Sequence, residues 1–427
     1  MGNRVVVHET YVSSNRIDYN YSVEGDWAIA FHLNEPFFIE YGDDISAVPE
    51  SVAVVPLLAN LLPMAWVYDA EIVAPVCDRD FFDSVEEFKK GFVDMYPMME
   101  LRGKLTVDAL EENRPSGQSG AAAFYSGGVD ALDTLIRHAE EKPTLLTVWG
   151  IDVAFEDTAG WERMKALIAQ AVDAFDVECV TIKSCLRRFI DKYELGKKIA
   201  VTGDQWWHGF QHGLGTYSHA APVAYARKIK SVYFASTFTT AEKGKQTCAS
   251  DPTIDNFVRF CGARVVHDGY DSERQMKVHN IAQCSQRMNR NFQLHVCWAA
   301  DGGSNCCLCE KCRRTLLAIF AENRDPNDFG LVHSEEQLRS LSKKMRYGII
   351  KKNAIPYYRP IRDAMRKNCR PKDLPRSIRW FYSTDVSKLS QDTPTKKARR
   401  YAKRVRRKVF SILKIPRNEK AVPSQRA

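Results

Sequence analysis

Apolar and polar positions in the first part of the chain change from a strand-like to a helix-like period. The stretches RVVVHETYV, IDYNYSV and WAIAFHL, between residue 3 and about residue 40, are separated by polar and Gly-containing turns, which is typical of strands. The longest apolar stretch, VAVVPLLANLLPMAWV at residues 52–67, is shorter than the ~20 residues that a membrane span needs. Pro56, Asn60 and Pro63 also interrupt it, so the pattern predicts a buried helix.

A strand around VYDAEIVAPV and a second helix in SVEEFKKGFVDMY are expected next. In that helix Val85, Phe88, Phe92 and Met95 fall on one face. The stretch ENRPSGQSG, residues 112–120, is rich in turn-forming residues and predicts a linker. We therefore expect a small N-terminal α+β domain over residues 1–115.

After the linker, short apolar stretches alternate with amphipathic ones. Strands are predicted in AAAFYS, PTLLTVWGID, VECVTIKS and SVYFAST, and the segments between them read as helices. Strands separated by helices of this length indicate βαβ units. We expect an α/β fold with a parallel sheet that carries helices on both faces, over residues 120–330.

Composition limits the class of protein. The chain has 427 residues, enough for two to three domains at ~150 residues each. With 44% apolar and 11% aromatic residues it is expected to fold. Its N-terminus, MGNRVVVHETY, lacks the pattern of an export signal, so we expect a cytoplasmic protein. In a reducing compartment, clustered cysteines bind metal more often than they form disulfides.

The net charge of +8 is distributed unevenly along the chain. Residues 335–427 contain 28 Lys and Arg against 7 Asp and Glu, a net charge of +21, which leaves −13 for the preceding residues. Residues 335–427 are expected to form a basic C-terminal extension. Its segment at residues 396–415 places Tyr401, Val405 and Val409 at helical spacing among many cations. An anionic membrane surface, RNA or plain solvent are the surroundings that fit such a segment.

The stretch FYSGGVDALDTLIRH predicts a strand that ends at Ser126, a turn through Gly127 and Gly128, and a helix that starts near Asp130. Glycines let the backbone approach a ligand closely, and the first N–H groups of a helix bind anions. Asp130 is a candidate ligand for the Mg²⁺ that accompanies nucleotide phosphates. A plain glycine-rich turn is the alternative.

Ser126-Gly127-Gly128-Val129-Asp130 resembles the SGGxDS loop of the PP-loop ATP pyrophosphatases, a Rossmann-like superfamily of the HUP class. The resemblance implies that this loop holds the pyrophosphate of ATP during adenylation of a substrate. Ala131 stands where the motif has a second serine, which removes one hydroxyl from the phosphate site. The resemblance further implies that Gly150 and Ile151 lie against adenine.

Five of the twelve cysteines lie in CWAADGGSNCCLCEKC, residues 297–312. Cys297, Cys306, Cys309 and Cys312 have the spacing of a tetrahedral four-thiolate zinc site, in which two-residue gaps present two sulfurs to one ion. A [4Fe–4S] cluster and unligated thiols are alternatives. Cys307 could also replace one of the four. Four thiolates leave no open position on the ion, so structural zinc in a helical lobe is favoured.

The cysteine pattern is similar to the Cys-x8-Cys-x2-Cys-x2-Cys zinc site of the 7-cyano-7-deazaguanine synthases, which are PP-loop enzymes. The two motifs have the same order, and the resemblance covers roughly residues 120–322. It implies ATP-dependent adenylation of a carboxylate or amide-like group, with release of pyrophosphate, followed by attack of a nitrogen nucleophile. The segments that would recognise a deazapurine have no match here, so that substrate is not carried over.

Polar residues between the two motifs are candidates for contact with substrate or phosphate. Thr237 and Lys243 follow the predicted strand SVYFAST, and a basic and an acidic pair flank one predicted crossover. That second group consists of Ser250, Asp251, Arg274 and Lys277. Arg274 and Lys277, with Asp130, are the catalytic candidates, because cations near the α-phosphate stabilise the charge that develops during adenylation. His208, His212 and His219 are expected to be ordinary packing residues.

Three hypotheses follow for the function. The first is an enzyme that uses ATP, Mg²⁺ and a structural Zn²⁺ to adenylate a small-molecule acceptor. The second is a PP-loop enzyme that modifies an RNA base, with the basic extension as the RNA contact. The third is a nucleotide-binding scaffold without catalysis, which the alanine at position 131 favours. A homodimer and a peripheral membrane location are left open.

Overall fold

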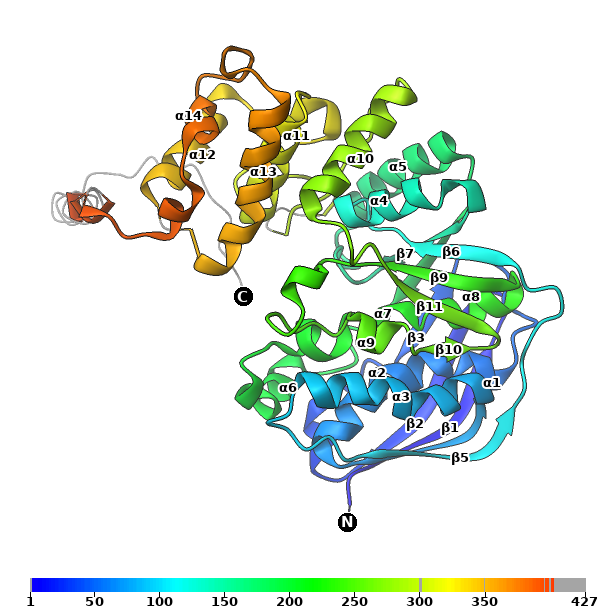
Figure 1. Cartoon of the computed structure of the whole chain (residues 1–427). Coiled ribbons are helices and arrows are strands. Elements are labelled where there is room, and N and C mark those ends of the chain that lie inside the picture. Colours follow the sequence, from blue (N-terminus) through cyan, green and yellow to red (C-terminus); the bar gives the residue numbers. More distant parts are fainter. Residues whose placement is uncertain (1, 299–301, 349, 395, 399–400, 403–427) are drawn as a thin grey trace. The chain divides into compact units, whose positions relative to one another are not determined.

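The computed structural model describes residues 2–298, 302–348, 350–394, 396–398 and 401–402. Two compact units divide the chain, Met1–Ser272 and Glu273–Ala427 (Figure 1). The first unit contains the sheet, and the second is built from helices. The chain therefore has the α/β character expected from its alternating pattern.

One sheet of eleven strands runs through the described part of the first unit, in the order β10-β11-β9-β6-β7-β8-β3-β2-β1-β4-β5. Most neighbouring pairs are parallel. The strands are β1 (Arg4–Val12), β2 (Arg16–Glu24), β3 (Phe38–Tyr41), β4 (Glu71–Asp78), β5 (Lys104–Glu111), β6 (Gly120–Phe124), β7 (Thr144–Trp149), β8 (Cys179–Ser184), β9 (Ile229–Ala235), β10 (Arg259–Phe260) and β11 (Ala263–Asp268).

The strands that follow the linker form a parallel block, β11-β9-β6-β7-β8. Numbered by their order along the chain, these five strands stand in the spatial order fifth, fourth, first, second, third. After β6, the chain adds β7 and β8 on one side of it, and then adds β9 and β11 on the other side. The direction of winding thus reverses between β6 and β9, the arrangement of a doubly wound α/β sheet.

The N-terminal strands continue the same sheet. β3 pairs antiparallel with β8, through Ile39 opposite Ser184, and joins the hairpin β1–β2 to the parallel block. Residues before and after the predicted linker therefore share one sheet, and the division between the compact units falls after Ser272. The linker itself carries the chain from edge strand β5 to central strand β6.

Helices cover both faces of this sheet (Figure 1). α4 and α5 lie on one side of β6 and β7, and α1, α2, α3, α7 and α8 lie on the other, between these strands and β1, β2 and β5. The helices of the first unit are α1 (Glu50–Ala53), α2 (Val55–Tyr68), α3 (Arg79–Met95), α4 (Val129–Arg137), α5 (Thr158–Phe175), α6 (Lys192–Lys198), α7 (Leu214–Tyr217), α8 (Ala220–Ala226) and α9 (Pro252–Asp255).

Helix α3 contacts both edges of the sheet. It packs against β10 at one edge and against β4 and β5 at the other, so the sheet curves around the inner helices. The Asp78 carboxylate accepts a hydrogen bond from the Phe81 N–H, which caps α3, and another from the Cys261 N–H at 2.9 Å. Cys261 is in the left-handed region, with φ of 43°, in the turn between β10 and β11. One buried carboxylate thus joins the start of α3 to the far edge hairpin.

The pattern of residues 52–67 predicted a buried helix correctly. Every residue of α2 from Val55 to Val67 is buried, which explains why the segment is apolar on all sides. The prediction of a strand in WAIAFHL is wrong. Gly25, at φ of 93°, turns the chain out of β2 into a short 3₁₀ helix, Asp26–Ala30, which places Trp27 in the core.

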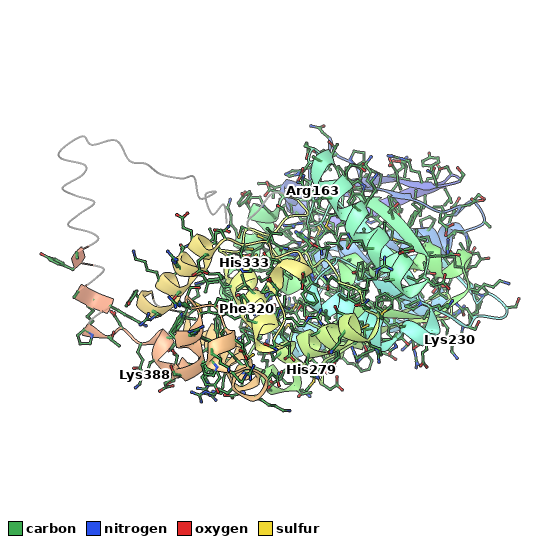
Figure 2. All side chains as sticks on the ribbon, turned by 90° about the horizontal axis from the view of Figure 1, so that it is seen from above. Arg163, Lys230, His279, Phe320, His333 and Lys388 are labelled. Carbon is green, nitrogen blue, oxygen red and sulfur yellow. The ribbon has the colours of Figure 1, made fainter. Side chains whose placement is uncertain are left out.

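The second unit consists of α10 (Arg274–Arg287), α11 (Glu310–Ala321), α12 (Glu335–Tyr347), α13 (Ile355–Asn368) and α14 (Arg379–Ser383). α11 lies at its centre and packs against α10 and α13. Nine of the twelve residues of α11 are buried, namely Cys312 and every residue from Arg314 to Ala321. The rings of Phe320, in this helix, and His333 pack edge to face, with their centroids 5.7 Å apart. Both residues are labelled in Figure 2.

Among the residues that the structure describes, none of the helices combines the length and the apolar character that crossing a bilayer requires. The basic helix predicted over residues 396–415 lies mostly outside the described residues. Residues 396–398 and 401–402, which are described, are helical.

Candidate functional site

The first candidate site lies where the strand order reverses. In open α/β sheets, ligands bind beyond the carboxyl ends of the strands at this position, because the two connecting loops diverge there and leave a crevice. β6 and β9 are the two strands that flank the reversal. The glycine turn, residues 126–128, leaves β6 at this point and leads into α4.

Gly127 can hardly be replaced by another residue. Its φ is 69°, in the left-handed region, and a Cβ atom would lie 2.3 Å from Cδ2 of Leu167 on α5. Gly128 is the N-cap of α4 and offers no side chain to cap it. The first N–H groups of α4 are therefore not bonded by a capping side chain and carry the positive end of the helix dipole. The turn has the backbone of an anion site.

The other residues of the motif divide into accessible and buried positions. Ser126 is exposed and Asp130, in the first turn of α4, is half-buried. Val129 is fully buried and Ala131 is 6% exposed. Ser126 is thus the exposed residue of the motif, while Gly127, Val129 and Ala131 are buried and Gly128 and Asp130 are half-buried.

Asp268, at the carboxyl end of β11, fixes α4 in place. It accepts hydrogen bonds from Oγ1 of Thr134 at 2.6 Å and from Nε2 of His138 at 3.1 Å, and it pairs with Arg137. The hydrogen bond to Asp268 raises the pKa of His138. Burial alone would raise the pKa of Asp268, but the hydrogen bonds from His138 and Thr134 and the charge of Arg137 outweigh burial and lower it. The sequence analysis did not single out these residues, because no local motif joins β11 to α4.

The end of β7 forms the neighbouring wall. Trp149 stacks on Trp161 of α5 with ring centroids 5.1 Å apart. Gly150 has a φ of 111°, and a Cβ atom there would lie 2.1 Å from the carbonyl oxygen of Ser184. The carbonyl oxygen of Ile151 accepts a hydrogen bond from Arg187 at 3.1 Å. Gly150 and Ile151 follow β7, the strand beside β6, and their contact with adenine stays a prediction.

Arg187 is a candidate that the sequence analysis missed. It follows β8, and its guanidinium lies over the ring of Trp207 at 4.5 Å. Burial lowers its pKa, and in the described part of the chain it forms no ion pair with a carboxylate. Trp207 begins a short π-helix, Trp207–Gln211, a form that often marks functional sites. The sequence signal that could have identified Arg187 is a cation three residues after the end of β8, a strand of the parallel block.

The residues after β9 have mixed roles. Thr237 and Lys243 are exposed, so both are accessible to a ligand. The loop between them is fixed at two points, where Ser236 donates to the Phe238 carbonyl at 2.6 Å and Thr239 and Glu242 form a capping box. The segment around Lys243 is thus attached to the end of the sheet at its base.

Ser250 and Asp251 serve the local structure. Oγ of Ser250 donates to Asp255 at 2.8 Å, and Nδ1 of His267 lies 2.7 Å from the same carboxylate, within a buried cluster. Asp251 is the N-cap of α9, where it accepts from the N–H of Thr253 at 2.9 Å. A substrate contact by Ser250 or Asp251 stays a prediction beside these roles.

Arg274 and Lys277 lie in the first turn of α10, in the second unit. Lys277 is 2% exposed. The contact of Arg274 and Lys277 with the α-phosphate of ATP stays a prediction, because these two residues belong to the second unit and the loop after β6 belongs to the first.

The three histidines are engaged in protein contacts. Nδ1 of His208 lies 2.9 Å from Asp204, and Nε2 of His219 lies 2.8 Å from Oγ of Ser184. His212 meets the ring of Phe234 edge-on at 5.7 Å. His219 is completely buried, and burial lowers its pKa to about 4.

The second candidate site is the cysteine cluster. The sulfurs of Cys297, Cys306, Cys309 and Cys312 all lie within 4.8 Å of one another. The pair Cys297–Cys309 is separated by 3.9 Å and the pair Cys306–Cys312 by 4.0 Å. Four sulfurs bound tetrahedrally at a Zn–S distance of ≈ 2.3 Å stand about 3.8 Å apart. The cluster therefore fits a metal ion and can hold zinc.

Backbone N–H groups turn toward two of these sulfurs. Sγ of Cys306 accepts from the N–H of Leu308 at 3.4 Å and of Cys309 at 3.2 Å, and Sγ of Cys309 accepts from Cys312 at 3.4 Å. Cys309 is also the N-cap of α11. The hydrogen bonds among the four thiols lower the pKa of Cys297 and Cys306 and raise that of Cys309 and Cys312, so they divide the cluster into thiolates and thiols. The backbone N–H donors and the helix dipole stabilise the thiolate, the form that binds metal.

Cys307 does not join the cluster. Its Sγ lies 3.2 Å from the carbonyl oxygen of Val332, and its backbone is left-handed, with φ of 52°. It is 1% exposed, and burial raises its pKa to about 12. The structure therefore favours the set of four without Cys307.

Asn305 is the residue that holds the loop before the cluster, and the sequence analysis missed it. Its side chain donates to the carbonyls of Leu294 at 2.6 Å and Gly330 at 2.9 Å, and accepts from the N–H of Val296 at 3.0 Å. These bonds bring the segment of Cys297 next to that of Cys306. An asparagine beside a cysteine motif was the available signal.

Comparisons of the chain with known protein families, with curated proteins and with solved structures give no match.

Proposed function

We propose that the first unit binds ATP with Mg²⁺ at the glycine turn and transfers its adenylyl group to a small acceptor. The observation that carries the proposal is the coincidence of two features. The strand order reverses between β6 and β9, and the turn that leaves β6 there has a left-handed Gly127 and an α4 N-terminus without a side-chain cap. Both features favour an anionic ligand at the same place.

The residues of the turn take roles that their positions allow. The N–H groups of Gly128 and the first turn of α4 bind the β- and γ-phosphates, and the exposed Ser126 hydroxyl donates to the same oxygens. Asp130 is the ligand for Mg²⁺, whose preference is for oxygen donors. Gly150 and Ile151, which follow β7 beside the glycine turn, are the residues proposed to lie against adenine.

The proposed reaction has two steps. An oxygen of the acceptor carboxylate or amide attacks the α-phosphorus of ATP, the bond to the β-phosphate oxygen breaks, and pyrophosphate leaves with Mg²⁺. A nitrogen nucleophile then attacks the activated carbon, loses a proton, and AMP leaves. Arg187 is placed to hold an anionic group because its guanidinium contacts a tryptophan ring and a carbonyl and forms no ion pair within the described residues, although Asp152 lies close enough to attract it. Arg274 and Lys277 are the cations proposed for the α-phosphate.

Zinc at the four cysteines has a structural role in this proposal. Four thiolates complete its coordination, so it supplies no Lewis-acid position to the reaction. It ties the segment before Asn305 to the start of α11, and thereby stabilises the second unit.

The test measures ATP binding and product identity together. Asp130→Asn is expected to weaken Mg²⁺-dependent ATP binding at least tenfold and to abolish pyrophosphate release in the presence of a metabolite extract. Asp108→Asn is the matched control, because this exposed carboxylate lies on β5. Release of orthophosphate alone, or equal ATP binding by both variants, would contradict the proposal.

A second candidate is a nucleotide-binding scaffold without catalysis. It is favoured by Ala131, a buried residue at the position where the superfamily has a serine hydroxyl. In this case ATP raises the melting temperature of the protein, and neither pyrophosphate nor an adenylylated species forms from any acceptor in the extract.

A further inference from the structure

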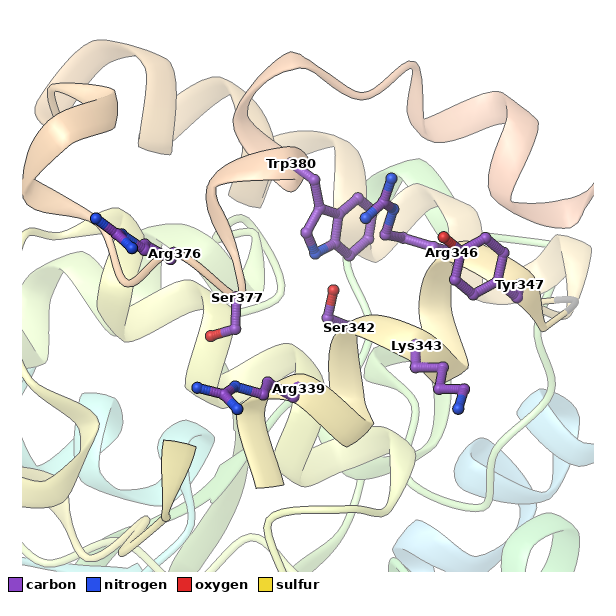
Figure 3. A pocket seen from close by; sticks show the side chains of 8 residues that line it. All are labelled: Arg339, Ser342, Lys343, Arg346, Tyr347, Arg376, Ser377 and Trp380. Carbon is purple, nitrogen blue, oxygen red and sulfur yellow. The ribbon is translucent and has the colours of Figure 1, made fainter. Parts of the chain in front are cut away.

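The helical second unit contains a hollow lined by cations, which neither candidate site uses. Its volume is about 270 Å³. One wall is a face of α12, with positions spaced three and four apart, and the other is the turn into α14 and its first residues. We call it the basic hollow, lined by Arg339, Ser342, Lys343, Arg346, Tyr347, Arg376, Ser377 and Trp380 (Figure 3).

The charges of the basic hollow are not balanced from within. Four of its eight lining residues are Lys or Arg, and none is Asp or Glu. Arg339 lies 3.5 Å from Glu335, but its side chain is 74% exposed, so this pair contributes little. Within the described residues, Lys343, Arg346 and Arg376 form no ion pair with a carboxylate. Glu335 lies at the rim, where it also accepts from the Ser377 hydroxyl at 3.5 Å, and it can balance only one of the four cations. The remaining cations repel one another, and an anion relieves that repulsion.

Neutral donors complete the site. Nε1 of Trp380 is buried and has no hydrogen-bond partner within the described chain. An indole N–H can only donate, so a buried one calls for an acceptor. In Figure 3 the nitrogen lies on the side of the ring that faces the hydroxyl of Ser342, whereas the Ser377 hydroxyl points away and donates to Glu335 at 3.5 Å. A phosphate oxygen in the hollow would accept from this N–H and from the Ser342 hydroxyl.

Aromatic rings hold one of the cations in position. The guanidinium of Arg346 lies 5.5 Å from the ring centroid of Tyr347 and 5.8 Å from that of Trp380. Contact with the faces of two rings leaves the N–H groups of the guanidinium available, because ring faces accept charge but take up few of its donors. Arg346 is thus oriented as an anion-binding arginine.

We propose that the basic hollow binds the phosphate group of a small phosphomonoester. Four cations, together with the donors of Ser342 and Trp380, suit a phosphate dianion better than a single carboxylate. The ligand is small, because the hollow, which is open to solvent, has a volume of only about 270 Å³. Residues 335–390 carry 15 Lys and Arg against 5 Asp and Glu, a net charge of +10, which raises the local concentration of anions.

The experiment is equilibrium dialysis of the full-length protein with radiolabelled ribose 5-phosphate and, separately, inorganic phosphate. Arg346→Gln combined with Arg376→Gln is expected to weaken binding of both probes at least tenfold. Lys351→Gln combined with Lys352→Gln removes the same charge from the same unit outside the hollow, and is expected to bind within twofold of the parent chain.

Two further variants keep the result independent of folding. Arg376→Gln alone changes an exposed residue and is expected to weaken binding several-fold. Trp380→Phe keeps an aromatic ring and removes only the N–H, with an expected loss of two- to fivefold.

Equal binding by the hollow and control variants would overturn the proposal. So would displacement of ribose 5-phosphate by an RNA ten-mer without terminal phosphates, because phosphodiesters of a polymer would then be the ligand. Binding of anionic phospholipid vesicles that is lost in the hollow variants, with no binding of ribose 5-phosphate, would overturn it in favour of a membrane surface. Neither result bears on the glycine turn, which lies in the other unit.

Discussion

The glycine turn and the cysteine cluster are both held by backbone geometry, but the two sites draw on different parts of the chain. All four sulfurs come from residues 297–312, and short gaps with N–H···S bonds bring them together. The glycine turn depends on residues far apart in the chain, since β9, Leu167 and Ser184 shape its surroundings. The geometry of the cysteine cluster is therefore expected to depend on a bound metal, whereas the geometry of the glycine turn is expected to depend on the packing of the surrounding core.

The largest expected effect is on the local site. Cys312→Ser replaces a fully buried ligand, and is expected to remove about one zinc per chain and to destabilise the second unit by several kcal/mol, because zinc binding supplies folding free energy. Metal analysis and calorimetry measure both quantities. Cys307→Ser is the matched control, and it should keep its metal. A Cys312→Ser protein that retains a full equivalent of zinc would contradict the assignment.

Acid is expected to act on the core of the first unit through His219. The folded chain holds this residue neutral down to a pKa of about 4, whereas the unfolded chain takes up the proton near its ordinary value of 6.5. The stability contribution is therefore present above pH 6.5 and is lost as the pH falls toward 4, by roughly 3 kcal/mol. Ser184, the hydrogen-bond partner of His219, packs against Gly150 at the end of β7. Loss of core stability in acid is therefore expected to disturb the first candidate site as well.

The measurement is urea unfolding between pH 7 and pH 4.5, followed for the parent chain and for His219→Gln. The difference between the two curves should shrink as the pH falls. His8→Gln, on exposed β1, should run parallel to the parent. Parallel curves for His219→Gln would show that the buried imidazole has no part in acid sensitivity.

Gly127→Ala tests the topological site directly. The added methyl group meets Leu167 and the left-handed backbone at once, so a loss of about 2 kcal/mol in the free energy of unfolding is expected, together with loss of ATP binding. Gly117→Ala has a similar φ, 73°, with nothing within 4 Å of the new Cβ, and should lose about 1 kcal/mol. Equal losses would mean that the contact with α5 is unimportant.

Ala131→Ser gives the smallest expected effect. A hydroxyl at this position restores a donor for phosphate, worth about 0.5–1 kcal/mol, which corresponds to a two- to fivefold gain in ATP affinity. Calorimetric titration with ATP and Mg²⁺ measures it, with Ala139→Ser as the control. Unchanged affinity would indicate that phosphate does not reach the first turn of α4.

The local site could be predicted almost completely from the sequence, because ligand spacing alone sets its geometry. The choice against Cys307 could not, since it depends on a left-handed backbone and on the carbonyl of Val332, 25 residues away. Asn305 escaped notice for the same reason, as its partners lie in distant segments.

The glycine turn was predicted as strand, turn and helix, but its surroundings were not. Periodicity identifies a strand without its neighbours, so the pairing of β3 with β8, which joins the N-terminal strands to the parallel block, could not be anticipated. β5 and β11 were also not expected. Asp251 could be taken for a ligand because a helix cap and a catalytic carboxylate look alike in a sequence.

The contact of α3 with both edges of the sheet has a consequence for synthesis of the chain. α3 is made early, while β10 and β11, whose hairpin is fastened to the start of α3 by Asp78, are made some 150 residues later. The surface of α3 that packs on β10 therefore stays uncovered for most of the time that the first unit is on the ribosome. Chaperone capture of truncated chains ending before residue 259, and weaker capture of longer ones, is the behaviour that this order of events entails.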